Sequence, residues 1–155
     1  MNKTKLWSKD FTIITITTFF VYLTFYLLMT TLTVYAIKQF SASQSQAGLA
    51  SSMFVIGALF SRILVGKYIE IIGRRKLMLT GLILFLIASI SYFTADNLNL
   101  LLVVRFVHGA VFGIAATAMA TAIMDIMPSE RRGEGTSYYS LSITLASAIG
   151  PFLGL

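Results

Sequence analysis

The sequence predicts an all-α membrane protein, a polytopic bundle in which apolar helices cross the bilayer repeatedly. Hydrophobic residues make up 57% of the 155 residues and charged residues only 12%, whereas soluble domains average about half and about a quarter. A run of about 20 apolar residues is long enough to cross a bilayer. The apolar runs predict five transmembrane helices in one membrane domain, residues 1–155, with spans over 11–37, 46–66, 77–95, 100–124 and 136–155.

Charge and rare residue types exclude several classes of function. The net charge of +6 arises from basic residues at the ends of apolar runs, so it predicts contact with a lipid bilayer and not with nucleic acid. The chain has no cysteine and one histidine, which argues against disulfides, thiolate chemistry and metal sites. Paired carboxylates, nucleophile motifs and phosphate-binding loops are also missing from the sequence. We therefore expect neither an enzyme nor a cofactor.

The segment from Gly66 to Lys76 fixes the expected orientation in the membrane. It reads GKYIEIIGRRK and carries four cations against one acidic residue, between two apolar runs. Because short cytoplasmic loops collect Lys and Arg, the segment is interpreted as a cytoplasmic hairpin between the second and third spans. The amino terminus, with Lys3, Lys5 and Lys9, is then cytoplasmic as well, and the protein is placed in the plasma membrane.

The first span is rich in Thr and Tyr, and four of these residues share a helical face. The spacing of Tyr22, Tyr26, Thr30 and Thr33 is three or four residues, which predicts a polar stripe that lines a substrate cavity. The alternative is that the hydroxyls bond back to carbonyls of their own helix and need no ligand. Both interpretations stay open on the sequence alone.

Two arginines lie inside predicted spans. Arg62 is near the cytoplasmic end of the second span, where we expect a structural role, with the side chain snorkelling or pairing with the hairpin. Arg105 lies about two turns inside the fourth span, and a charge there normally faces a bundle interior or an aqueous cavity. Arg105 is therefore a candidate for the substrate or proton pathway, or else is held by carbonyls to order helix packing. His108 is a candidate for the same pathway, with a hydrogen-bonded packing role as the alternative.

A resemblance to a known family rests on the hairpin. The positions of Gly66, Glu70, Gly73, Arg74 and Arg75 resemble the signature loop of the major facilitator superfamily, although Glu70 replaces the usual Asp and Ile71 a basic residue. The resemblance implies that this loop is a cytoplasmic latch whose contacts change between transport states. The residues themselves suggest a close backbone approach at Gly66 and a left-handed helix end at Gly73. The alternative is that the basic residues only anchor the topology.

Three further segments are similar to the same family. Arg105 and Gly109 resemble its fourth-span motif. The sequence DIMPSERRG resembles its second cytoplasmic loop, at the positions Asp125, Pro128, Arg132 and Gly133. In this loop we expect Pro128 to start a turn and the glycines to relieve the backbone before the next helix. We also expect Asp125 to pair with Arg132. The fifth span resembles an antiporter signature at Gly150, Pro151 and Gly154, from which Ala146 and Leu155 depart, and its Pro and Gly residues predict a kinked helix pressed against a neighbour.

The resemblance implies five spans of the six-helix amino-terminal half of a transporter that is similar to drug:proton antiporters. It implies proton-coupled efflux of a small, drug-like molecule by alternating access, with the missing carboxy-terminal half as a partner. The chain ends inside an apparent span, so we expect a truncated unit. The rival hypothesis is an accessory or nonfunctional membrane subunit that does not transport alone.

Overall fold

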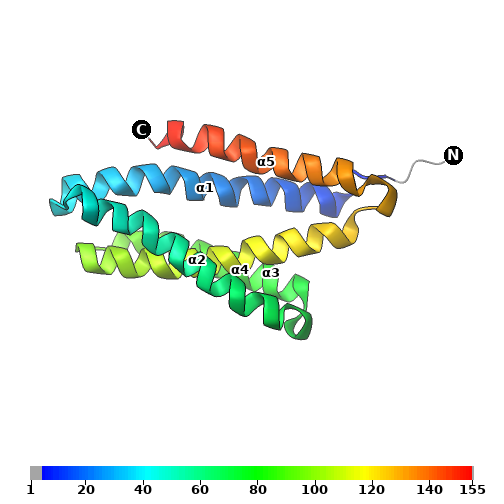
Figure 1. Cartoon of the computed structure of the whole chain (residues 1–155), viewed down its shortest axis with the longest axis horizontal. Coiled ribbons are helices and arrows are strands. Elements are labelled where there is room, and N and C mark those ends of the chain that lie inside the picture. The colour runs from blue at the N-terminus through cyan, green and yellow to red at the C-terminus, as the bar shows by residue number, and fades with distance from the viewer. Residues whose placement is uncertain (1–4, 155) are drawn as a thin grey trace.

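The computed structural model describes residues 5–154, so Lys3 and the end of the fifth predicted span lie outside it. Within this range all regular structure is helical, as predicted, and the long helices run nearly parallel or antiparallel (Figure 1). The elements are α1 Lys9–Phe40, α2 Gln44–Ile72, α3 Arg74–Ile90, η1 Ser91–Thr94, α4 Leu98–Ile126, η2 Ser129–Arg131 and α5 Arg132–Leu153.

Polar caps explain where the first, second and fourth helices begin. Ser8 accepts a hydrogen bond from the backbone of Phe11 at 3.2 Å, and Asn97 accepts one from Leu100 at 2.9 Å. Ser43 and Gln46 form a reciprocal capping box at the start of α2. These residues satisfy amide groups that have no partner inside the helix. The helices therefore begin at polar residues just before the apolar runs that define the predicted spans.

The junction between α2 and α3 is shorter than the predicted hairpin. Helix α2 continues through Gly66 to Ile72, and Gly73 alone separates it from α3. Gly73 has φ +91°, a conformation that a side chain would disfavour. The close approach expected at Gly66 is wrong for residues 5–154, because no atom lies within 4 Å of the place a Cβ would take. The predicted loop is thus almost entirely helical.

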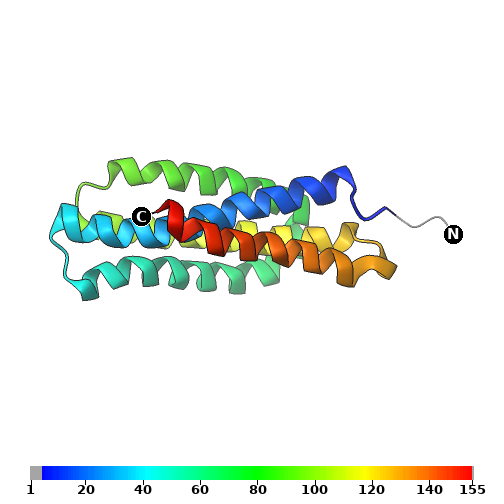
Figure 2. The same cartoon turned by 90° about the horizontal axis from the view of Figure 1, so that it is seen from above.

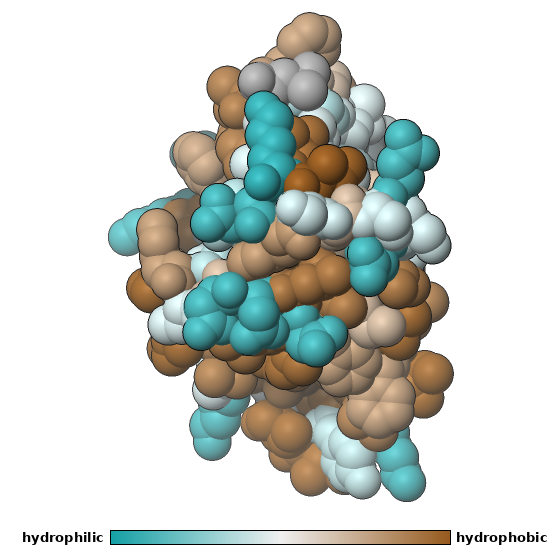
Figure 3. Space-filling view, turned by 90° about the vertical axis from the view of Figure 1, so that its left-hand side faces the viewer, coloured by the Kyte–Doolittle hydropathy of each residue, from teal (hydrophilic) through white to brown (hydrophobic). Residues whose placement is uncertain are grey.

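Helix α4 occupies the middle of the bundle and contacts α1, α2 and α3, whereas α5 packs on α1 (Figures 1 and 2). One end of the bundle, which we call the basic end, carries the exposed or half-buried cations Lys5, Lys9, Arg74, Arg75, Lys76, Arg131 and Arg132. The opposite end, the far end, holds the turns at Ser41–Ser43 and Ala95–Asn97. Figure 3 looks onto the far end, where hydrophilic side chains gather.

Within residues 5–154, four segments are long and apolar enough to cross a membrane: α1, α2, Arg74–Thr94 and α4. Helix α5 lies alongside α1 but begins with a Thr, Ser and Tyr-rich stretch, which lowers its hydropathy. Large apolar side chains of α3 face outward, among them Ile83 at 59% exposure and Leu86 at 62%. Apolar side chains exposed in this way suit contact with lipid.

The tightest contact joins α2 and α4, and we call it the α2–α4 seam. A Cβ on Gly109 would overlap the carbonyl of Phe54, and one on Gly57 would overlap the carbonyl of Phe106. Only glycine allows the two backbones to approach this closely, which is how membrane helices gain contact area without a hydrophobic effect between them. The seam therefore depends on residues that contribute no side chain.

Candidate functional site

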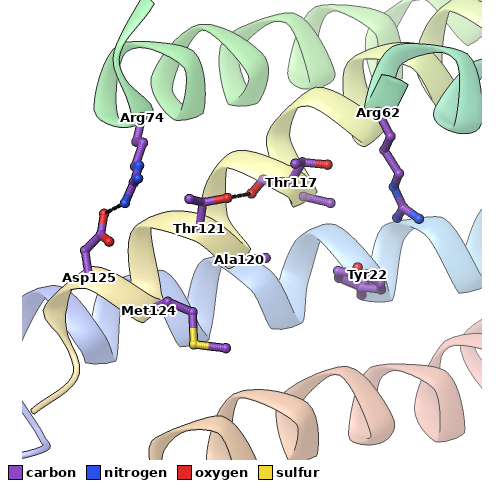
Figure 4. Close-up of a pocket in the computed structure, with 9 residues that line it drawn as sticks. Tyr22, Arg62, Arg74, Thr117, Ala120, Thr121, Met124 and Asp125 are labelled. Carbon is purple, nitrogen blue, oxygen red and sulfur yellow. Dashed lines mark hydrogen bonds and ion pairs between the residues drawn. The ribbon is translucent and has the colours of Figure 1, made fainter. Parts of the chain in front are cut away.

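A cavity of about 580 Å³ opens between α1, α2, α3 and α4 in the half of the bundle toward the basic end, and we call it the trough (Figure 4). Its volume lies within the range of about 300 to 1,000 Å³ typical of small-molecule sites. The residues that line it are Tyr22, Arg62, Arg74, Ala116, Thr117, Ala120, Thr121, Met124 and Asp125.

Helix α4 supplies the long wall of the trough. Thr117, Ala120, Thr121 and Met124 follow one another at three- and four-residue spacing, so they share a face. The Thr121 hydroxyl donates to the Thr117 carbonyl at 2.9 Å, which leaves the oxygen of Thr121 free to accept a hydrogen bond. The sequence analysis did not single out these residues. A pair of threonines four residues apart in an alanine-rich span was the available signal.

Arg62 lies at one end of the trough. Its side chain extends from α2 toward Tyr22 of α1 (Figure 4). The Tyr22 ring stands edge-on to Phe112, with centroids 5.1 Å apart. Arg62 forms no ion pair with any carboxylate of residues 5–154. The expected pairing with the hairpin is therefore not found, and the guanidinium faces the cavity instead.

Three charged residues meet at the other end of the trough, and we call them the latch triad: Glu70, Arg74 and Asp125. The Nη2 atom of Arg74 donates to Oε1 of Glu70 at 2.7 Å, and Nη1 pairs with Oδ2 of Asp125. The three side chains come from α2, α3 and α4, so Arg74 ties three helix ends together. Figure 4 shows its pair with Asp125.

The latch triad is open to solvent, because the side chains of Arg74, Glu70 and Asp125 are 32%, 71% and 51% exposed. Ion pairs in such positions contribute about 0–1 kcal/mol each. The triad therefore holds the helix ends together, yet separating them requires little free energy. Asp125 pairs with Arg74 and not with Arg132, the partner expected from the sequence.

The segment between α4 and α5 is compact. The carbonyl of Pro128 accepts a hydrogen bond from the backbone of Arg131 at 3.0 Å, which closes a turn. Helix α5 begins at Arg132, so Gly133 lies inside the helix and not before it. Arg131 donates to Glu134 at 2.7 Å, and this bond raises the pKa of the Arg131 guanidinium, which stays charged.

Arg105 lies in the α2–α4 seam and is fully buried. Its Nε donates to the carbonyl of Ala50 at 2.8 Å, its Nη1 lies 3.4 Å from the Tyr92 hydroxyl, and its Cζ lies 4.6 Å from the centre of the Phe54 ring. Nη2 has no partner among residues 5–154. These contacts match the packing alternative, and Arg105 does not line the trough. Its part in a substrate or proton pathway stays a prediction.

His108 is fully buried beside Arg105. Nδ1 lies 2.9 Å from the Tyr92 hydroxyl and Nε2 lies 3.1 Å from the Ser89 hydroxyl. Both ring nitrogens thus have a hydroxyl neighbour, as expected for a histidine held within helix packing. Tyr92 contacts both Arg105 and His108, so it joins them in one polar cluster, which the sequence did not reveal.

The four polar residues predicted to share one cavity on the first helix are separated by their neighbours. Tyr22 alone lines the trough. Tyr26 and Thr30 lie against Gly150 and Gly154 of α5. Thr33 donates to the carbonyl of Met29 at 2.9 Å and lies 3.2 Å from the Ser51 hydroxyl of α2. The four residues thus face the trough, α5 and α2 in this structure, and a common role in lining a substrate cavity stays a prediction.

The antiporter-like residues lie where α5 meets α1. A Cβ on Gly150 would be 2.6 Å from Cβ of Tyr26, and the Thr31 hydroxyl donates to the Gly154 carbonyl at 3.2 Å. Pro151 occupies the last turn of α5, which continues to Leu153. Pro151 has no amide to donate to the carbonyl of Ser147, so the last turn of α5 lacks one helix hydrogen bond, and the predicted kink stays a prediction.

Residues 5–154 contain no group of three or more His, Cys, Asp or Glu side chains that could hold a metal ion. The site consists of a solute-sized cavity, one guanidinium without a carboxylate and an ion-paired triad across three helix ends. These features, in a bundle of long apolar helices, define a polytopic membrane protein that surrounds a small-molecule cavity.

Comparison with known proteins identifies the family. A model of the Major Facilitator Superfamily matches residues 14–155, and the chain belongs to this family of membrane transporters. The chain is thus an integral, multi-pass membrane protein of a family that handles small molecules and is not a family of enzymes, and the resemblance drawn from the hairpin is confirmed.

Curated relatives include both drug and sugar transporters. The chain is 30% identical over 104 residues to Multidrug resistance protein 3 of Bacillus subtilis (strain 168), covering 67% of this chain and 20% of that protein. It is 29% identical over 113 residues to Multidrug export protein EmrB of Haemophilus influenzae, covering 73% and 22%. It is 26% identical over 106 residues to a D-xylose transporter of Levilactobacillus brevis, covering 68% and 23%. The matched segments span about a fifth to a quarter of these proteins.

Proposed function

We propose that this chain is the amino-terminal part of a transporter that exports a small, drug-like molecule by alternating access. The observation that carries the proposal is the latch triad at the mouth of the trough. An exposed ion-paired junction across three helix ends holds one arrangement of a bundle yet opens at low cost. Transport requires two such arrangements of similar free energy.

The partner of this unit is a second, carboxy-terminal half. In many secondary transporters the substrate site lies near the membrane midplane between two repeats, which rock against each other. The trough, open between α1, α2, α3 and α4, offers one wall of such a site. Glu70 and Asp125, with 71% and 51% of their side chains exposed, can exchange Arg74 for groups of that second half as the cavity opens.

We place the basic end in the cytoplasm, with the amino terminus on the same side, and the protein in the plasma membrane. The concentration of cations at the basic end supports this orientation. The absence of cysteine gives a direct test, because single cysteines can be introduced without background. A membrane-impermeant maleimide added to intact cells should label Gln44→Cys at the far end, and Lys76→Cys only after permeabilisation. Labelling of Lys76→Cys in intact cells would show that the basic end lies outside the cell, opposite to this proposal.

We further propose that export is coupled to proton entry. The antiporter-like residues Gly150, Pro151 and Gly154 support this direction, as do relatives whose names include multidrug export. In this proposal Arg105 and His108 hold Tyr92 in place and order the α2–α4 seam beside the substrate and proton pathway. Relatives named for D-xylose favour sugar import as the second candidate function.

The test is accumulation of two drug-like compounds of opposite charge, ethidium and labelled 2-naphthoate, and of labelled xylose, in cells that express this chain or a full-length version. Export predicts lower accumulation of at least one of the two drug-like compounds with the full-length version, reversed by a protonophore and by Arg74→Gln. Lys67→Gln, which removes an exposed cation outside the triad, is the matched control and should leave export intact. Xylose uptake without export of either drug-like compound would favour the second candidate.

The accessory or nonfunctional subunit makes a different prediction in the same assay. Neither the chain alone nor the full-length version would change the accumulation of any of the compounds, although immunoblots of the membrane fraction showed that both proteins were present there. Export by the full-length version but not by the chain alone would identify the chain as a unit that requires its second half.

A further inference from the structure

We infer that the trough selects an organic monoanion, an apolar body that carries one carboxylate or sulfonate, with Arg62 as its anion-binding residue. The inference rests on the proposed transport function and names the substrate class for that same cavity. It starts from the charges that face the trough, and from which of them are already paired.

Three charged side chains line the trough: two guanidinium groups, Arg62 and Arg74, and one carboxylate, Asp125. Together with Glu70, which pairs with Arg74, these groups sum to zero: the latch triad carries one net negative charge and Arg62 carries one positive charge. Arg74 is engaged by both Asp125 and Glu70. Arg62 has no carboxylate partner within residues 5–154, so it is the cation available to a ligand.

The charges are separated along the trough. Figure 4 shows Arg62 at one end and the Arg74–Asp125 pair at the other, with Ala120 and Thr121 on α4 between them. A ligand whose acidic group lies at Arg62 would therefore place its body along the α4 wall. Ala116, Ala120 and Met124 give that wall its apolar surface, and the Thr121 oxygen can accept one hydrogen bond.

A second, smaller cavity of about 160 Å³ adjoins the same end, and Tyr22 and Arg62 line both cavities. Its other walls include Phe25, Phe54 and Phe112. The acidic group of a ligand would thus meet a guanidinium between an aromatic recess and the trough. Arginine presents a planar fork that matches a carboxylate or sulfonate with two parallel hydrogen bonds.

The same arrangement disfavours other ligand classes. An organic cation would face the unpaired charge of Arg62, and the one carboxylate of the trough is already bound to Arg74. A neutral ligand would leave the charge of Arg62 without an anionic partner. Specificity arises from such unfavourable alternatives as much as from favourable contacts.

The test is equilibrium binding to the chain in phosphatidylcholine nanodiscs, using three radiolabelled naphthalene derivatives of nearly equal shape. These are 2-naphthoate, the neutral 2-naphthylmethanol and the cationic 2-naphthylmethylammonium, with empty nanodiscs as the background. A hydrogen bond to a charged group contributes about 1.5–3 kcal/mol. We therefore expect naphthoate to bind about 10- to 100-fold more tightly than either analogue.

Variants assign the effect to one residue. Arg62→Gln should weaken naphthoate binding about 10-fold or more and remove the preference over the alcohol, whereas Arg62→Lys should keep part of it because the charge remains. Lys67→Gln removes an exposed cation of the same helix and should change nothing. The same measurements on a full-length version should give the same order.

Several outcomes would overturn the inference. The ammonium probe could bind as tightly as naphthoate or more tightly, or naphthoate could show no saturable binding. Lys67→Gln could weaken naphthoate binding as much as Arg62→Gln does, or Arg62→Gln could leave naphthoate binding to the full-length version unchanged because another side chain pairs with Arg62. The proposed function is tested separately: export of ethidium or 2-naphthoate by the full-length version, together with binding that does not depend on ligand charge, would support transport and reject only the selection of anions.

Discussion

Arg105 and Arg74 are arginines of the same bundle, yet their surroundings are opposite. Arg105 is fully buried in the α2–α4 seam and is held by a carbonyl, a hydroxyl and the face of an aromatic ring. Arg74 is one-third exposed at the basic end and is held by two carboxylates. One arginine is locked by packing, whereas the other is held by charges that water and salt weaken.

The difference shows how a membrane bundle divides its tasks. The seam is assembled from glycines and a buried cation, so it cannot change without breaking contacts between backbones. The basic end is assembled from long, exposed, charged side chains that exchange partners at little cost. Rigid packing in the seam thus carries the fold, and the movable contacts lie where the helices end.

The largest expected effect comes from adding one methyl group to the seam. Gly109→Ala places a Cβ against the Phe54 carbonyl, where backbone has to move, so we expect a loss of about 3 kcal/mol in the free energy of unfolding. Gly66→Ala meets open space in a helix and should be neutral or stabilising by up to about 1 kcal/mol. Unfolding by dodecyl sulfate in bicelles measures both. Equal effects would remove the contrast between seam and basic end.

A smaller loss should follow the removal of the buried guanidinium. Arg105→Ala gives up the bond to Ala50 and the contact with Phe54, and it leaves a void, so we expect a loss of about 2–3 kcal/mol. Arg62→Ala is the matched control, since that arginine faces a cavity and should change the free energy of unfolding by less than about 0.5 kcal/mol. A stable Arg105→Ala protein would show that the seam does not need its charge.

The smallest effect is expected in the latch triad. A double-mutant cycle with Arg74→Ala and Asp125→Ala should give a coupling below about 1 kcal/mol, because both side chains are exposed. The coupling should shrink further between 0.05 M and 0.5 M salt, as expected for screened charges. Unfolding curves of the four proteins at each salt concentration supply the numbers. A coupling above about 2 kcal/mol would mean that the junction is as fixed as the seam.

Much of the fold followed from the sequence, because an apolar run long enough to cross a bilayer permits few structures besides a helix. The ends were less predictable. Helix α2 continues through Gly66 to Ile72, since one glycine costs about 1 kcal/mol and the surrounding helix outweighs it. Gly73 was predictable, because a one-residue junction with positive φ requires that residue type.

The site was harder to predict, because helical spacing tells which residues share a face but not which helix that face meets. Tyr22 and Tyr26 are one turn apart, yet one lines the trough and the other lies against Gly150. The ion pair of Arg74 with Asp125 joins residues 51 positions apart, and no local sequence pattern predicts it. Residue types in single spans suggested candidates, and only the packing of α1, α2 and α4 brought them together.

The contact between α1 and α5 has a consequence for the order of synthesis. The Thr31 hydroxyl bonds to the carbonyl of Gly154, which is 123 positions later in the chain. At about 5–20 residues per second, roughly 6 to 25 s pass between the appearance of these two residues on the ribosome. During that interval the carbonyl of Gly154 does not yet exist as an acceptor for the Thr31 hydroxyl. The Thr31 hydroxyl also donates to its own helix at Leu27, 2.9 Å away, so it is already satisfied while the nascent chain waits in the membrane.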